Sequence, residues 1–105
     1  MRTIKVMADY HCYPLWEPVD CDSGPLSPDD LPITQSLRDA LMAWASAFDA
    51  TLNIETAETG FPSQAAADQF KATGYELAKR LQQELGSEFK VTHNIRAFPK
   101  KLRLR

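Results

Sequence analysis

The sequence predicts an α/β (α+β) fold, a two-layer sandwich in which a helical hairpin packs on a small two- to three-stranded sheet in the order β-α-α-β. Alternating apolar and polar residues predict strands at residues 3–8 and 89–98. Between them, apolar residues recur at helical spacing in residues 34–50 and 64–85. With 105 residues, 44% of them hydrophobic, the chain can bury one core, so we expect a single domain over residues 1–105.

The first predicted strand leads directly into an aromatic stretch, residues 9–16. These eight residues contain two tyrosines and a tryptophan together with a histidine, a cysteine and a proline. Pro14 fixes its own φ and disfavours helix at the preceding residue, so we expect a stiff, turning loop here. Its aromatic side chains must bury against the domain or contact a partner. For Trp16 both interpretations stay open, because tryptophan is common in cores and also among binding anchors.

An acidic segment, residues 17–31, follows the aromatic stretch. It contains three prolines, a glycine and no basic residue, which is typical of a loop, and Ser27–Asp30 fits a single helical turn. A loop of this length is often a binding surface. Its carboxylates do not have the spacing of a calcium loop, so the choice lies between a solvated loop and an acidic interface. The aspartates concerned are Asp20, Asp22, Asp29 and Asp30.

The two helices have recognisable ends. Thr34 is a suitable N-cap for the first helix, and Ser63 for the second. Trp44 lies on the apolar side of the first helix, so we expect it in the core. Gly74 in the middle of the second helix predicts close approach of a neighbouring element, and Gly86 fits the residue just past its end.

A sheet of only two strands would be marginally stable, so we expect a third strand from residues 52–55 or 102–105. Pro99 ends the last predicted strand. Residues 99–105 form a basic tail that either adds an edge strand or frays. The sequence leaves the order of the strands open.

The charge is distributed unevenly along the chain. Residues 1–88 carry 14 acids and 6 bases, a net charge of −8, whereas residues 89–105 carry 6 bases and no acid, a net charge of +6. An acidic body favours a basic protein partner over direct contact with nucleic acid. The longest uncharged run, residues 40–48, is too short to cross a bilayer, and Asp9 interrupts any signal-peptide pattern. We therefore expect a cytoplasmic protein with no membrane contact.

The residues able to carry chemistry are Cys12, Cys21, His11 and His93. They lack the spacing of a zinc site, and a reducing compartment disfavours a disulfide. Cys12 lies beside acidic residues, which disfavours a reactive thiolate. We expect no cofactor, no metal and no enzymatic activity. The alternative is a small enzyme or ligand-binding domain whose pocket lies between the aromatic stretch and the last strand.

Most of the chain up to about Val91 resembles a family of small bacterial proteins similar to the immunity proteins of polymorphic toxin systems, including contact-dependent growth inhibition. The basic tail after Ile95 lies outside the resemblance. The residues that carry the likeness are residues 4–16, with their Asp-Tyr-His-Cys-Tyr-Pro-Leu-Trp run, Leu31–Thr34, Trp44–Ala45, Phe48–Asn53, Gly60–Phe61, Gly74, Leu77–Ala78, Leu81–Gln82 and Glu84–Gly86.

The resemblance implies a non-enzymatic, cytoplasmic immunity protein that binds a cognate protein toxin. In such systems the toxin is often a basic nuclease, and the acidic segment suits such a partner. We therefore predict that this protein occludes the toxin's active site without contacting nucleic acid itself. A module of a larger regulatory assembly is a third interpretation. The predicted partner-binding residues are Trp16, Glu17, Asp20, Asp22, Asp29 and Asp30.

Overall fold

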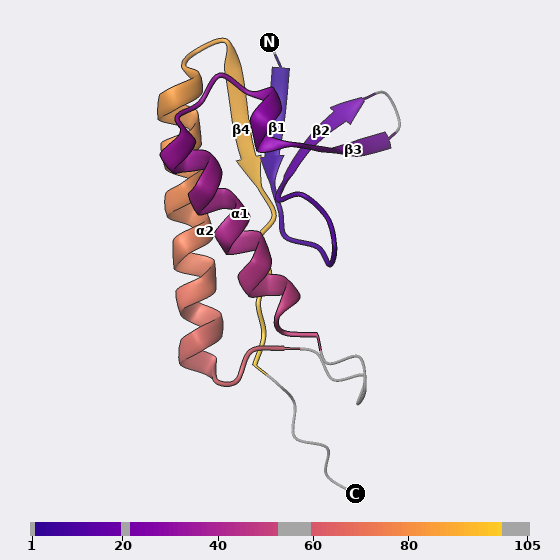
Figure 1. Ribbon diagram of the computed structural model, residues 1–105, viewed down its shortest axis with the longest axis vertical. Helices are drawn as coiled ribbons and strands as arrows, with labels where there is room; N and C mark the ends of the chain where they lie inside the picture. Colours follow the sequence, from indigo (N-terminus) through magenta and orange to yellow (C-terminus); the bar gives the residue numbers. More distant parts are fainter. Residues whose placement is uncertain (1, 20–21, 53–59, 100–105) are drawn as a thin grey trace, which may run out of the picture.

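The computed structural model describes residues 2–19, 22–52 and 60–99 and has two layers, a mixed sheet and a helical hairpin that covers one of its faces (Figure 1). The strand order is β3-β2-β1-β4, with β4 parallel to β1 and the other neighbours antiparallel. The elements in chain order are β1 (Arg2–Val6), β2 (Leu15–Val19), β3 (Asp22–Leu26), the 3-10 turn η1 (Pro28–Asp30), α1 (Gln35–Asp49), α2 (Gln64–Leu85) and β4 (Phe89–His93).

The predicted α+β sandwich is confirmed, but the sheet of the described residues has four strands instead of two or three. The extra strands, β2 and β3, come from the segment that we expected to be loop. The third strand that we expected from residues 52–55 or 102–105 falls almost entirely outside the described residues, and so do residues 100–105 of the basic tail. No described helix combines the length and the apolar character that a bilayer crossing requires.

Both helices begin and end where the sequence predicts, within one residue. The Thr34 hydroxyl accepts a hydrogen bond from the backbone N–H of Leu37, and the Ser63 hydroxyl accepts one from that of Ala66. At the end of α2, Gly86 has a φ of 81°, in the region that favours glycine. The caps satisfy backbone groups that the helices leave unpaired, so each end is fixed locally.

The core lies between the sheet and the helical hairpin. Its largest fully buried side chains come mainly from β1, β2 and both helices, and include Ile4, Leu15, Leu41 and Leu81. Gly74 allows α2 to approach α1 and the segment after β4, because a Cβ built there would lie 2.6 Å from Trp44 Cζ2 and 2.8 Å from Ile95 Cδ1. The predicted burial of Trp44 and the predicted close approach at Gly74 are therefore confirmed.

β4 ends at His93, five residues earlier than predicted. β1 ends at Val6, whose carbonyl accepts the last bond from the backbone N–H of Asn94, so the following residues have no strand beside them. The segment after β4 continues alongside the helices, where Ile95 and Ala97 are buried. The alternation that predicted a longer strand thus reflects packing against the helices.

Candidate functional site

Two antiparallel strands occupy most of the acidic segment, so the prediction of a loop for residues 17–31 is wrong at residues 17–19 and 22–26. We call β2 and β3 together the arm. All five residue pairs from Leu15↔Leu26 to Val19↔Asp22 join the two strands of the arm to each other. Only Leu15 and Trp16 also pair with β1. The arm therefore diverges from the sheet beyond Trp16 (Figure 1).

Proline explains why the arm leaves the sheet. Met7 donates its N–H to Pro14 O, and Lys5 lies opposite Trp16, so the same register would place Thr3 opposite Pro18. In an antiparallel ladder with this register, Lys5–Trp16 and Thr3–Pro18 are the pairs that exchange backbone hydrogen bonds. Pro18 has no N–H to donate to Thr3. Pairing with β1 stops there.

A bidentate ion pair braces the arm just where backbone pairing ends. Arg2 Nε donates to Glu17 Oε2 at 2.7 Å, and Arg2 Nη2 donates to Glu17 Oε1 at 2.8 Å. The guanidinium carbon also lies 5.4 Å from the centre of the Phe89 ring. These hydrogen bonds raise the pKa of Arg2 and lower the pKa of Glu17 from their ordinary values. Two parallel hydrogen bonds fix the orientation of the Glu17 carboxylate relative to the Arg2 guanidinium as well as the distance between them.

Trp16 sits at the base of the arm and is half-buried. Its indole N–H donates to Met7 O at 2.9 Å, so the ring is tied to the loop that follows β1. The charge of Glu17, the next residue, is balanced by the ion pair with Arg2. The sequence did not suggest that Arg2 contacts Glu17. Trp16 and Glu17 are placed to fix the arm's base, and part of each remains accessible to a partner.

The three predicted aspartates that the structure describes do not form one cluster. Asp29 and Asp30 are exposed on η1, which begins two residues after β3 and is capped by the Ser27 hydroxyl, as predicted. Asp22 begins β3 at the far end of the arm, and Asp20 lies outside the described residues. A strand advances about 3.3 Å per residue, so β3 alone separates Asp22 from the segment that leads into η1 by about 13 Å.

The aromatic stretch mostly anchors the loop to α1. The Tyr10 ring lies 4.5 Å from the Phe48 ring, and its hydroxyl is 2.8 Å from Thr51 Oγ1. The His11 backbone N–H donates to Asp49 Oδ1, and His11 has a φ of 60° at the turn. The predicted turning loop is thus confirmed up to Tyr13, whereas Leu15 and Trp16 belong to β2.

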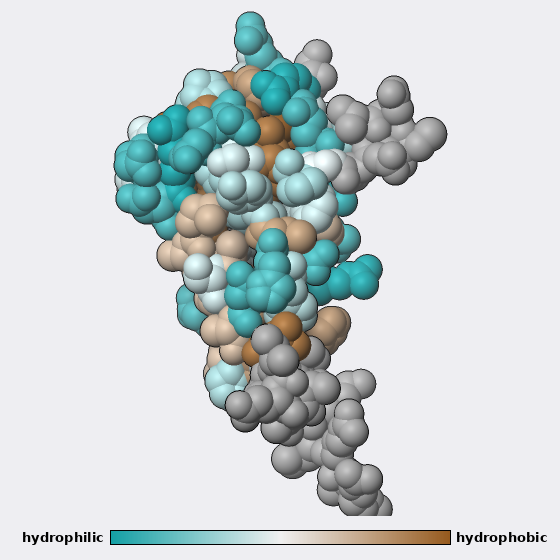
Figure 2. All heavy atoms as spheres, turned by 45° about the vertical axis from the view of Figure 1, so that its right-hand side comes forward, coloured by the Kyte–Doolittle hydropathy of each residue, from teal (hydrophilic) through white to brown (hydrophobic). Residues whose placement is uncertain are grey.

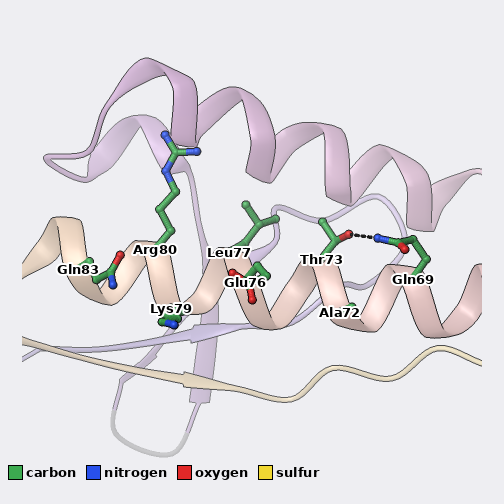
Figure 3. A pocket seen from close by; sticks show the side chains of 8 residues that line it. All are labelled: Gln69, Ala72, Thr73, Glu76, Leu77, Lys79, Arg80 and Gln83. Atoms are coloured by element: carbon green, nitrogen blue, oxygen red, sulfur yellow. Dashed lines mark hydrogen bonds between the residues drawn. The ribbon is translucent and has the colours of Figure 1, made fainter.

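Two surface depressions of the described residues were compared with the pocket that the enzymatic interpretation requires, beside His11, Cys12 and His93. One is a shallow depression along a single face of α2 (Figure 3), whose polar side chains include Glu76, Lys79 and Arg80. Neither this depression nor the larger groove between the helices is lined by His11, Cys12 or His93. Among the residues that the structure describes, no three histidine, cysteine or acidic residues are grouped as a metal site would need. A disulfide between Cys12 and Cys21 is not tested, because Cys21 lies outside the described residues.

The larger groove lies on the outside of the hairpin, between the C-terminal half of α1 and the start of α2. Its volume is about 860 Å³ and its walls include three alanines of α1, Ala40, Ala43 and Ala47, with Phe61 and Phe70 contributed from the second half of the chain. Trp44 and Phe70 stack there with ring centres 4.6 Å apart. Figure 2 shows hydrophilic side chains over much of the upper part of the molecule around a strip of apolar ones, and a mixture of apolar and hydrophilic side chains lower down.

The chain matches the model of one protein family, described as Serratia CdiI immunity protein-like, over residues 2–95. A comparison with curated proteins gives no match. The matched region contains both helices, all four strands and every predicted contact residue, and it ends at Ile95, before the basic tail.

Proposed function

This chain belongs to the Serratia CdiI immunity protein-like family, and from that premise we propose that it neutralises a cognate toxin of a contact-dependent inhibition system by covering the toxin's active site. The toxin we propose is a nuclease. Its active site must hold phosphates and is therefore lined by basic side chains. An acidic partner surface is complementary to such a cleft.

The observation that carries this proposal is the acidic stretch of the chain that runs through the arm into η1. Between Trp16 and Leu31 the chain has no basic residue, while Asp29 and Asp30 are exposed. The proposed contacts in this stretch are Trp16, Glu17, Asp20, Asp22, Asp29 and Asp30. Complementary charge of this kind acts mainly on the rate of association and on specificity, and it weakens as salt is raised.

The test uses the C-terminal domain of a contact-dependent toxin sought beside this chain's gene, which we call the adjacent-gene toxin domain. Co-expression of the chain should restore the growth of cells that produce this domain, and the two purified proteins should form a stable complex. Growth arrest that persists despite a well-expressed, folded chain would contradict the immunity role.

The surface itself is tested by charge reversal. Asp29→Lys with Asp30→Lys should slow association with the toxin domain by about tenfold or more at low salt, with less difference at high salt. Asp39→Lys with Asp68→Lys is the matched control, since both residues are exposed on the helices and the net charge changes equally. Equal losses for the two double variants would show that net charge alone matters and would remove η1 from the interface.

A further inference from the structure

The arm is weakly held by its own backbone. Beyond Trp16 its strands pair only with each other, and an isolated two-stranded hairpin is marginally stable in water. Pro18 prevents the ladder from continuing along β1. The direction of the arm is therefore set by side chains, and the best-placed of these is Arg2, whose guanidinium joins β1 and Phe89 of β4 to Glu17 of β2.

We infer that Arg2 is a positioning residue for toxin binding, which aims the arm so that it meets the toxin as a preformed hairpin through its side chains, and not by adding a strand. This inference rests on the proposed function. Arg2 itself need not contact the toxin, because Glu17 and the Phe89 ring already occupy its guanidinium. Holding a binding element in its bound direction strengthens binding by reducing the entropy lost on association.

Strand addition is disfavoured at the arm because each edge contains a proline. In the observed register the N–H positions of Leu15 and Glu17 face β3, so Pro18 faces the β1 side. Pro25 lies opposite Trp16, a position where the backbone of β3 faces outward. Neither edge can offer the continuous row of N–H groups that strand addition uses.

The first half of the opposite edge of the sheet, in β4, is also covered. Gln82 of α2 donates to Phe89 O at 2.8 Å and accepts from the Val91 N–H at 2.8 Å. Its side-chain amide takes the place that a neighbouring strand would occupy beside the first half of β4. A partner must therefore recognise side chains, and the direction in which the arm presents them matters.

Arg2→Gln tests the inference, with Arg80→Gln as the matched control. Arg80 also pairs with a glutamate, Glu84, and its loss changes the net charge by the same amount. Removing a positive charge should by itself slightly strengthen binding to a basic toxin. We expect Arg2→Gln instead to weaken binding to the adjacent-gene toxin domain by about three- to tenfold, while Arg80→Gln does not weaken it.

A double-mutant cycle separates bracing from direct contact. If Arg2 acts through Glu17, then Arg2→Gln with Glu17→Gln should bind no more weakly than the weaker single variant, because both remove the same brace. Additive losses would mean that Arg2 contacts the toxin independently, which would overturn the positioning role. Arg2→Lys, which keeps the charge but loses the fork, should restore only part of the affinity.

Hydrogen exchange on the free chain gives a readout that needs no toxin. Arg2→Gln should speed exchange at the arm amides of Glu17 and Gly24 and leave the core amides of Leu41 and Leu81 unchanged, which also shows that the variant is folded. Unchanged exchange in the arm would overturn the bracing role whatever the toxin does. If the wild-type chain fails to bind the toxin domain, both the proposed function and the positioning role of Arg2 in toxin binding are wrong. Hydrogen exchange on the free chain then still shows whether Arg2 braces the arm.

Discussion

Gly74→Ala is the sharpest test of how the helical layer is packed. The added Cβ would lie 2.6 Å and 3.1 Å from two atoms of the Trp44 ring and 2.8 Å from Ile95 Cδ1. Carbon atoms in contact normally stay about 3.5–4.0 Å apart, so both neighbours must move. Ile95 can rotate its terminal methyl group. Trp44 has less freedom, because it stacks on Phe70 with an interplanar angle of 9° and its indole N–H donates to Phe70 O at 3.0 Å.

The net effect on stability follows from two opposing contributions. Overpacking a core costs about 1–3 kcal/mol, and the fixed tryptophan places this site in the upper half of that range. Replacing a mid-helix glycine by alanine returns about 1 kcal/mol of helix propensity. We therefore expect Gly74→Ala to lower the free energy of unfolding by about 1–2 kcal/mol, which lowers Tm by about 4–16 °C in a domain of this size.

The measurement is urea and thermal unfolding followed by circular dichroism and tryptophan fluorescence. Gly24→Ala is the control, since a Cβ at Gly24 meets nothing within 4 Å, and it should change stability by no more than about 0.5 kcal/mol. A Gly74→Ala variant as stable as the wild type, or more stable, would show that the helices do not approach as described.

Three further substitutions test the helix N-termini and the edge of β4. Glu84 accepts hydrogen bonds from the backbone N–H and hydroxyl of Thr34, which lower its pKa below the ordinary 4.5, so its stabilisation is complete above that pH and is lost as the pH falls through the lowered pKa. Glu84→Gln should therefore cost about 1 kcal/mol at pH 7 in urea melts, and the difference should vanish in acid. Ser63→Ala should remove about 1 kcal/mol by deleting the N-cap of α2, and an unchanged midpoint would refute that cap. Gln82→Ala should expose the edge of β4 and speed its amide exchange, and light scattering should detect self-association, whereas slow exchange would show that the clamp is dispensable.

The helices could be predicted accurately because local signals determine them. Thr34 and Ser63 are caps whose hydroxyls bond the first turn, and Gly86 supplies the positive φ after α2. The apolar stripe of α1 placed Trp44 in the core, and Gly74 marked the point where the neighbouring elements approach α2. None of these inferences requires knowledge of a distant partner in the chain.

The arm could not be predicted because its strands violate local preferences. Pro18, Gly24 and Pro25 indicate a loop by composition, yet each proline lies where its missing N–H faces away from the other strand of the arm. Which way a strand residue faces depends on the register with β1, and that is a tertiary property. The same holds for Arg2, since the sequence contains nothing that joins it to Glu17, fifteen residues away.

The predicted aspartate contacts came from the length and the acidic composition of residues 17–31. The sequence predicted Asp20, Asp22, Asp29 and Asp30 in one loop, whereas the structure places Asp22 at the start of β3 and Asp29 and Asp30 on η1, after the arm ends. The distribution suits an extended basic surface on the partner better than a single cation.

Hydrogen exchange of the complex with the adjacent-gene toxin domain tests the central claim most directly. The account predicts that toxin binding slows exchange at the arm and η1, including Glu17, Gly24, Asp29 and Asp30, and leaves the outer faces of α1 and α2 unchanged. Protection confined to the alanine-lined groove between the helices, with the arm exchanging as in the free chain, would contradict it.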